Sequence, residues 1–188
     1  MKELKSSALQ AARVIPVYLL RATYHGNNLI ARYHMMMQAT LGGIALSHGS
    51  ANEGHVFGHM IGWKYHIPHG IAEGITLPYC SLEHNIPVFS REIANLAKAW
   101  GLDVSGLTER EAAYKLIHAC VKLLKDLGMP WKLSQISGAK REDLPEMAKL
   151  LVETPFFKTM FNIACKRRIS EKECLAILER MYDGVFLE

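Results

Sequence analysis

Apolar residues recur every three or four positions along most of this chain, and strict alternation of apolar and polar residues is nearly absent. This spacing predicts amphipathic α-helices, because a side chain returns to the same helix face after three or four residues. The pattern predicts helices over about 8–23, 29–46, 54–66, 68–83, 88–100, 109–127, 142–152 and 171–181. We therefore expect an all-α, bundle-like fold of about eight helices in a single domain over residues 1–188.

Short local motifs mark where several of these helices begin or bend. Thr108 with Glu111, and Ser170 with Glu173, have the spacing of a capping box, in which each residue's side chain bonds the other's backbone N–H. Pro16 lies inside the first helical pattern and is expected to kink or divide that helix. These motifs refine the helix limits but leave the fold class unchanged.

The helix predicted over 29–46 has an unusual composition. It is rich in methionine and carries the adjacent pair Gly42 and Gly43. Glycine inside a helix lowers its stability unless a neighbour packs closely against the backbone. We therefore expect this helix to be central and buried.

Composition and charge exclude several classes of function. The chain has 188 residues, 49% of them hydrophobic, which is enough for one substantial core. Its 22 basic and 18 acidic residues are dispersed apart from the Lys166-Arg167-Arg168 cluster, which lacks interleaved aromatic residues for base stacking. The longest stretch without formal charge, 33–52, is too polar for a membrane span. We expect a soluble protein with neither nucleic acid nor membrane as a partner.

The cysteines indicate the compartment. The chain has four cysteines, they lie far apart, and none forms a CxxC pair: Cys80, Cys120, Cys165 and Cys174. They mostly occur within apolar helical patterns, where a small thiol is an ordinary core residue. This usage fits a reducing, cytoplasmic environment.

Candidate chemistry is concentrated in residues 54–70, which read GHVFGHMIGWKYHIPHG. His55 and His59 are four residues apart and so share one helix face, and neutral imidazole is the commonest metal ligand in proteins. Pro68 disfavours helical backbone in the residue before it, so one helix should end near His66 and the next begin at Pro68 or His69. A bend there could return His69 toward His55. Glycines in this segment would allow a ligand or a second helix to approach closely.

Spacing alone leaves the role of these histidines open. A closed metal site needs four ligands and a catalytic site usually three, so two imidazoles are not sufficient. Glu73 follows His69 by four residues on the same predicted face, where it could be a ligand, a residue that orients a ligand, or a surface or capping residue. The histidines could equally be hydrogen-bonded residues with no metal.

The order of residues around the histidines matches a known pattern: His55, His59, Gly62, Tyr65, Pro68-His69-Gly70, Leu77-Pro78 and Asn85. The preceding stretch, ARYHMMMQATLGGIAL, combines Ala-Arg and methionine with small residues in the same way. This arrangement resembles the carboxy-terminal helical domain of the iron-containing (group III) alcohol dehydrogenases, firmly over about 29–85. The spacing favours this family over the zinc enzymes of the same fold, which resemble glycerol dehydrogenase or dehydroquinate synthase.

The resemblance assigns roles to three histidines. It implies that His55 and His69 are metal ligands, and that His59 is the catalytic residue that lines the pocket beside nicotinamide and substrate and relays the alcohol proton. It gives His66 no role. The family's other two ligands belong to an Asp-x-x-x-His motif that would fall ahead of Met1. Its amino-terminal NAD(P)-binding domain also has no counterpart here, so no residue of this chain is assigned to cofactor binding.

The implied function is therefore that of one part of an enzyme. We expect the carboxy-terminal metal-binding domain of an NAD(P)-dependent alcohol dehydrogenase that interconverts an alcohol and an aldehyde or ketone, whether as a fragment, a truncated reading frame or a split-enzyme subunit. The expected cofactors are a divalent metal, Fe(II) by family precedent with Zn(II) as the alternative, and NAD or NADP in the intact enzyme. The expected partners are a small alcohol or aldehyde, the missing nucleotide-binding domain in cis or on a separate chain, and further copies in a homo-oligomer. The isolated chain is expected to be inactive.

A second interpretation assigns no catalysis to the chain. In it the histidines are structural, and the domain is a helical interaction module that pairs with another subunit. Its nine methionines would suit a partner surface.

The sequence also departs from the family at Glu73, where Asn is frequent, and at 166–168, where Asn-Pro-Arg is frequent.

Overall fold

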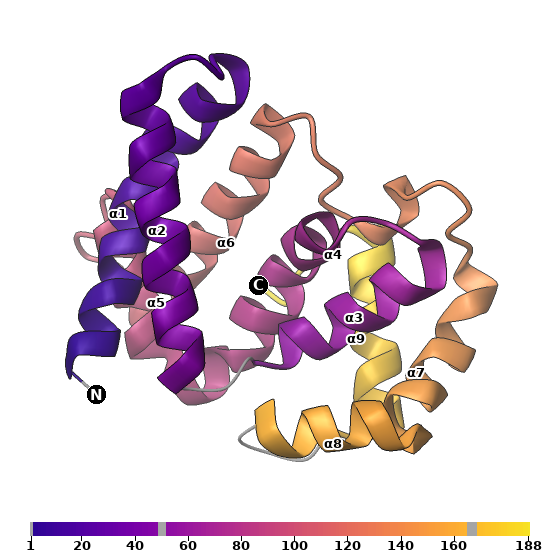
Figure 1. The fold of residues 1–188 in the computed structure, drawn as a ribbon. Coiled ribbons are helices and arrows are strands. Elements are labelled where there is room, and N and C mark those ends of the chain that lie inside the picture. Colours follow the sequence, from indigo (N-terminus) through magenta and orange to yellow (C-terminus); the bar gives the residue numbers. More distant parts are fainter. Residues whose placement is uncertain (1, 49–51, 165–168) are drawn as a thin grey trace. The chain divides into compact units, whose positions relative to one another are not determined.

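The computed structural model describes residues 2–48, 52–164 and 169–188, and these residues form helices and loops with no β-strand (Figure 1). The prediction of an all-α fold is confirmed. The described residues contain nine α-helices, one more than the expected eight or so, together with four short π- or 3₁₀-helical segments. Cys165 and the Lys166-Arg167-Arg168 cluster lie outside the described residues.

The chain packs as two compact units, the first of residues 1–50 and 86–127 and the second of residues 51–85 and 128–188. Each unit is assembled from two separate stretches of sequence, so neither corresponds to a continuous half of the chain. The prediction of a single domain over residues 1–188 stays a prediction.

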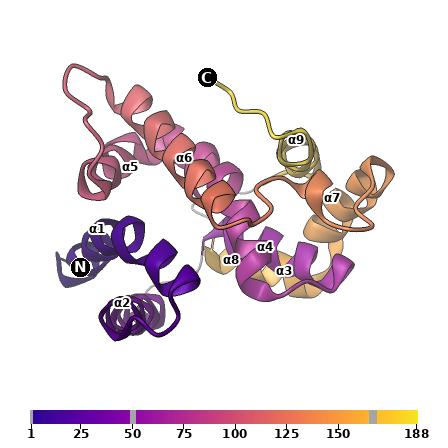
Figure 2. The same cartoon turned by 90° about the horizontal axis from the view of Figure 1, so that it is seen from above.

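The first unit consists of α1 (Lys2–Tyr24), α2 (Leu29–His48), α5 (Ile86–Trp100) and α6 (Glu109–Asp126). α1 packs against α2 and α5, and α5 packs against α6. Figures 1 and 2 show α1 and α2 side by side. Both hydrogen bonds of the predicted capping box at the start of α6 are present. α1 continues through Pro16, so the helix is not divided there, because a proline removes one backbone hydrogen bond of a long helix and leaves the others. The alternative prediction, a kink at Pro16, stays a prediction.

The prediction that α2 is central and buried is wrong. Leu29, Ile30 and Met36 are 79%, 68% and 67% exposed. Among the described residues, nothing outside the backbone of α2 itself and the adjacent residues lies within 4 Å of a Cβ placed on Gly42 or Gly43. α2 packs mainly on α1, and only one of its faces is covered by that contact. Within the first unit, α2 therefore keeps an apolar face that its neighbours do not cover.

The second unit holds the histidine segment. Its elements are α3 (Glu53–Tyr65), α4 (His69–Thr76), the π-helix η1 (Leu77–Leu82), η2 (Glu83–Asn85), η3 (Leu133–Gln135), η4 (Arg141–Asp143), α7 (Leu144–Glu153), α8 (Pro155–Ala164) and α9 (Glu171–Asp183). α3 packs against α4, α7 and α8, and α9 packs against α7. The core side chains include Phe57, Met60, Ile75, Met147 and Leu178, all 0% exposed. The face of α3 opposite this core is left for the histidines.

Prolines explain where the helices differ from prediction. The helix expected over 68–83 is α-helical only to Thr76, and Pro78 lies in the first turn of the π-helix η1 that follows, where its missing N–H is tolerated. α5 begins at Ile86, ahead of Pro87, because a proline is tolerated in a first helical turn. The sequence pattern did not predict α8, in which Phe157 and Phe161 face the core.

Two further sequence predictions concern the cysteines and the possibility of a membrane span. The described cysteines, Cys80, Cys120 and Cys174, are buried and free, as expected for core thiols. None of the helices in the described ranges has the length and apolar composition that crossing a membrane requires.

Candidate metal centre

The bend between α3 and α4 positions the histidines. The Asn52 side chain accepts the backbone N–H of Gly54 at 3.0 Å and so caps the start of α3. α3 ends at Tyr65, and the residue that caps it, His66, has a left-handed φ of 52°, the only positive φ of a non-glycine residue in the described ranges. Pro68 follows, and His69 is the first residue of α4. The predicted end near His66 and start at Pro68 or His69 are thus confirmed, and His66 forms the turn.

The start of α3 is also tied to the end of η2. The amide Nδ2 of Asn85 donates to Glu53 Oε1 at 2.5 Å and to the backbone carbonyl of Ser81 at 3.1 Å. Ser81 Oγ donates to Asn52 Oδ1 at 3.1 Å. These bonds hold the first turn of α3, which carries His55, against the segment that follows α4.

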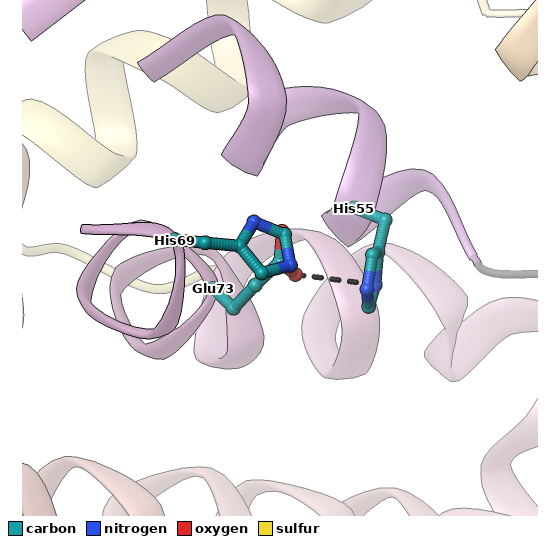
Figure 3. A group of neighbouring side chains, drawn as sticks. All are labelled: His55, His69 and Glu73. Carbon is teal, nitrogen blue, oxygen red and sulfur yellow. Dashed lines mark ion pairs between the residues drawn. The ribbon is translucent and has the colours of Figure 1, made fainter. Parts of the chain in front are cut away.

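Figure 3 shows His55, on α3, facing His69 and Glu73, on α4. The Glu73 carboxylate lies between the two rings: its Oε2 is 3.2 Å from His55 Nδ1, and its Oε1 is 3.7 Å from His69 Nδ1. One candidate ligand atom from each of the three residues lies within 4.8 Å of the others. The structure therefore brings together the two histidines predicted as ligands, and adds a carboxylate.

Gly58 makes this arrangement sterically feasible. A Cβ on Gly58 would overlap Glu73 Oε1 and lie 2.7 Å from the Glu73 carboxyl carbon. The carboxylate consequently rests against the backbone of α3, one turn after His55. Its Oε1 is buried and has no hydrogen-bond partner in the described part of the chain. A buried carboxylate oxygen without a donor is costly, and a cation would compensate it.

The electrostatics of the site favour neutral imidazoles. Burial, followed by the charges of His69 and His59, lowers the pKa of His55. Burial, followed by the charge of His69, lowers the pKa of His59. Burial also raises the pKa of the Glu73 carboxyl to about 7. Neutral imidazole is the form that binds metal, and a bound cation would favour the ionised carboxylate.

These residues fit a divalent metal ion. Two imidazoles and a carboxylate are a borderline donor set that accepts Fe(II), Zn(II) and related ions. The His55 side chain is 33% exposed and that of His69 55%, so the site is open on one side. A catalytic metal requires such an open side for substrate or further ligands.

His59 lies beside this group rather than in it. Its ring centroid is 5.2 Å from that of His69 and 6.3 Å from that of His55. It also meets the ring of Phe156 edge to face, with centroids 6.2 Å apart. A cavity of about 370 Å³ adjoins it, lined by His59, Trp63, Leu150, Thr154, Phe156 and Phe157. The sequence did not predict this cavity, because it depends on α8.

An all-α fold that gathers two histidines and a carboxylate at a helix bend has the features of a candidate metal centre. Residues 4–182 match the Fe-containing alcohol dehydrogenase family, C-terminal, and the chain belongs to this family. The predicted resemblance is confirmed and extends well beyond residues 29–85.

Individual relatives agree with this assignment. The chain is 32% identical over 177 residues to the 1,3-propanediol dehydrogenase of Klebsiella pneumoniae, covering 94% of the chain and 44% of that protein. It is 31% identical over 143 residues to the NAD-dependent methanol dehydrogenase of Bacillus methanolicus, covering 76% and 37%. The structure of an alcohol dehydrogenase from Oenococcus oeni superposes with a TM-score of 0.84 at 30% identity, covering 94% and 44%. The chain thus spans less than half the length of these relatives.

Proposed function

We propose that this chain is the metal-binding, carboxy-terminal part of an NAD(P)-dependent alcohol dehydrogenase that interconverts an alcohol and an aldehyde or ketone. The observation that carries the proposal is the convergence of His55 and His69, in a chain of this family, on one cluster at the bend between α3 and α4. The metal is Fe(II) by family precedent, with Zn(II) as the alternative. The nicotinamide-binding residues belong to a partner domain in cis or on another chain.

In this proposal His55 and His69 hold the metal through their neutral imidazoles. The metal would supply Lewis acidity, which favours the alkoxide that must form before a hydride can leave. The contact between His55 Nδ1 and Glu73 Oε2, 3.2 Å, orients the His55 ring, and the start of α4 places the backbone of His69 beside it. This arrangement before metal binding reduces the ordering cost of binding.

His59 is proposed as the catalytic residue that receives the alcohol proton. It borders both the cluster and the cavity, so a substrate whose polar end lies at the cluster could extend its carbon chain along Trp63 and Phe156. An imidazole in this position can accept a proton and pass it to solvent. A small alcohol or aldehyde is accordingly the proposed substrate.

Metal content tests the ligand assignment. Equilibrium dialysis of the chain against Zn(II), with bound metal measured by mass spectrometry, should show binding to the wild type and almost none to a His55→Ala/His69→Ala variant, because both imidazole donors are lost. His66→Asn is the matched control, since Asn tolerates the left-handed backbone at that position. Equal metal content in the wild type and the double variant would contradict the assignment.

A second prediction concerns activity. The chain alone should produce no NAD(P)H in the presence of an alcohol, at any metal load. Its sequence contains no GxGxxG turn, and the described residues contain no βαβ unit to bind the nicotinamide nucleotide. Reduced nicotinamide is measured by its absorbance at ~340 nm. An alcohol-dependent rise of this absorbance above that of the His55→Ala/His69→Ala variant would refute the expectation.

One observation favours the non-catalytic interaction module as the second candidate. The exposed apolar residues of α2, among them Leu29, Ile30 and Met36, form a surface that suits a protein partner. Dialysis against Zn(II) distinguishes the two candidates. A module with structural histidines would bind as little metal as the His55→Ala/His69→Ala variant, whereas the enzyme domain would bind more. A glycerol-dehydrogenase-like enzyme would bind through the same residues with zinc as its native metal.

A further inference from the structure

Glu73 is where this site departs from the pattern that its family resemblance implies. The family often has Asn at this position, and the resemblance assigns it no ligand role. In this chain the side chain is a carboxylate that lies between His55 and His69 and contacts both. Its position is set by α4, on which it follows His69 by one turn, and by Gly58 of α3, which leaves room for it.

We propose that Glu73 is a third metal ligand, so that His55, His69 and Glu73 together bind a divalent first-row cation without a donor from outside this chain. This inference rests on the proposed function in one respect: it takes His55 and His69 as metal ligands. Two imidazoles and one carboxylate on one face of an ion form a recognised three-donor site with open positions.

The spacing of the three side chains fits one ion. One nitrogen from each ring and one carboxylate oxygen lie within 4.8 Å of each other. An ion with metal–ligand distances of about 2.0–2.2 Å holds neighbouring ligand atoms about 3.0–3.5 Å apart, so side-chain rotations that draw these three atoms closer together would close the site. Figure 3 shows the three side chains side by side, with the Glu73 carboxylate joined to the His55 ring by the marked ion pair.

The contact with His55 accounts for one oxygen of the carboxylate, Oε2, but not for the other. A residue that only orients His69 would accept its ring N–H, but the 3.7 Å from His69 Nδ1 to Glu73 Oε1 is too long for such a bond. Oε1 is buried and has no donor in the described part of the chain. An unpaired buried oxygen destabilises the fold, whereas a cation bound at this oxygen would offset that cost.

The test is a titration of the full chain with Zn(II) and with Co(II). Glu73→Gln should bind Zn(II) at least about tenfold more weakly, since one charged donor is lost. Gly58→Ala should weaken binding in the same direction, because its methyl group displaces the carboxylate, while helix content is unchanged or higher. Glu153→Gln, which changes an exposed carboxylate on α7, is the matched control and should bind like the wild type.

Co(II) distinguishes a ligand from a residue that orients one. If Glu73 is a ligand, the visible spectrum of bound Co(II) should change in Glu73→Gln, because the donor set changes. Weaker binding with an unchanged spectrum would overturn the proposal, as would unchanged affinity. If Glu73→Gln binds normally while His55→Ala/His69→Ala does not, only the role of Glu73 is wrong. If the double variant also binds normally, or the wild type binds neither ion, the ligand assignment of the proposed function fails as well.

Discussion

Replacing Arg180 by alanine is expected to lower the free energy of unfolding by about 3–5 kcal/mol. Glu83 has a side chain only 1% exposed, and its Oε2 accepts the Nε–H of Arg180 at 3.1 Å. The other carboxylate oxygen accepts the backbone N–H of Leu187 at 2.5 Å. Without Arg180, the buried Glu83 carboxylate would keep its hydrogen bond from Leu187 and lose the positive charge of Arg180. Breaking one side of a buried ion pair is costly because the remaining charge is left unpaired.

Urea unfolding followed by circular dichroism measures this effect, which should move the midpoint by about 1 M or more. Arg141→Ala is the matched control: Arg141 also pairs with an acidic residue, Asp183 of α9, but the two side chains are 50% and 41% exposed. Loss of an exposed pair should cost less than about 1 kcal/mol. Equal losses in the two variants would show that burial of Glu83 does not determine the stability of the second unit.

Phe57→Ala is expected to cost a similar amount, about 3–5 kcal/mol. Phe57 is 0% exposed on α3, and its ring meets that of Phe161 on α8 with centroids 5.9 Å apart. Removing the ring leaves a cavity that the packed core cannot fill, and it removes a contact that holds α8 against α3. Because α8 supplies Phe156 and Phe157 to the cavity beside His59, the cavity should also lose its shape.

The control for this prediction is Trp63→Ala on the same helix, because Trp63 is 61% exposed and its truncation should change stability by less than about 1 kcal/mol. The same urea titration compares the two variants. A smaller loss for Phe57→Ala than for Trp63→Ala would contradict the packing of α3 against α8.

The parts of the fold that could be predicted are those set by residues close together in the sequence. The capping boxes at Thr108 and Ser170 form as predicted, since both partners lie within four residues. The turn through His66 to His69 follows equally from Pro68, which acts on the adjacent backbone. Such local chemistry does not depend on the rest of the fold.

Burial was not predictable from composition in the same way. α2 carries glycines and methionines that indicate close packing, yet Leu29 and Met36 are exposed. Composition shows that a helix suits burial, but a packing partner has to be present for burial to occur. α8 was missed because the Pro155 that begins it also resembles a loop residue.

The site was predictable in part. The spacing of His55 and His69 and the intervening bend were enough to place them together. The position of the Glu73 carboxylate was not, because it depends on how closely α4 approaches α3 at Gly58. The cavity beside His59 likewise requires residues about ninety positions later in the chain, which no local pattern relates to it.

The most direct test of the metal centre is nitrogen-resolved NMR of the histidine side chains during titration with Zn(II). The ring nitrogens of His55 and His69 should shift as one equivalent of Zn(II) is added, because direct coordination changes them most. His25 and His118, in the first unit, serve as internal controls and should not move. Binding of Zn(II) with the His55 and His69 signals unchanged would contradict the assignment of these two residues as metal ligands.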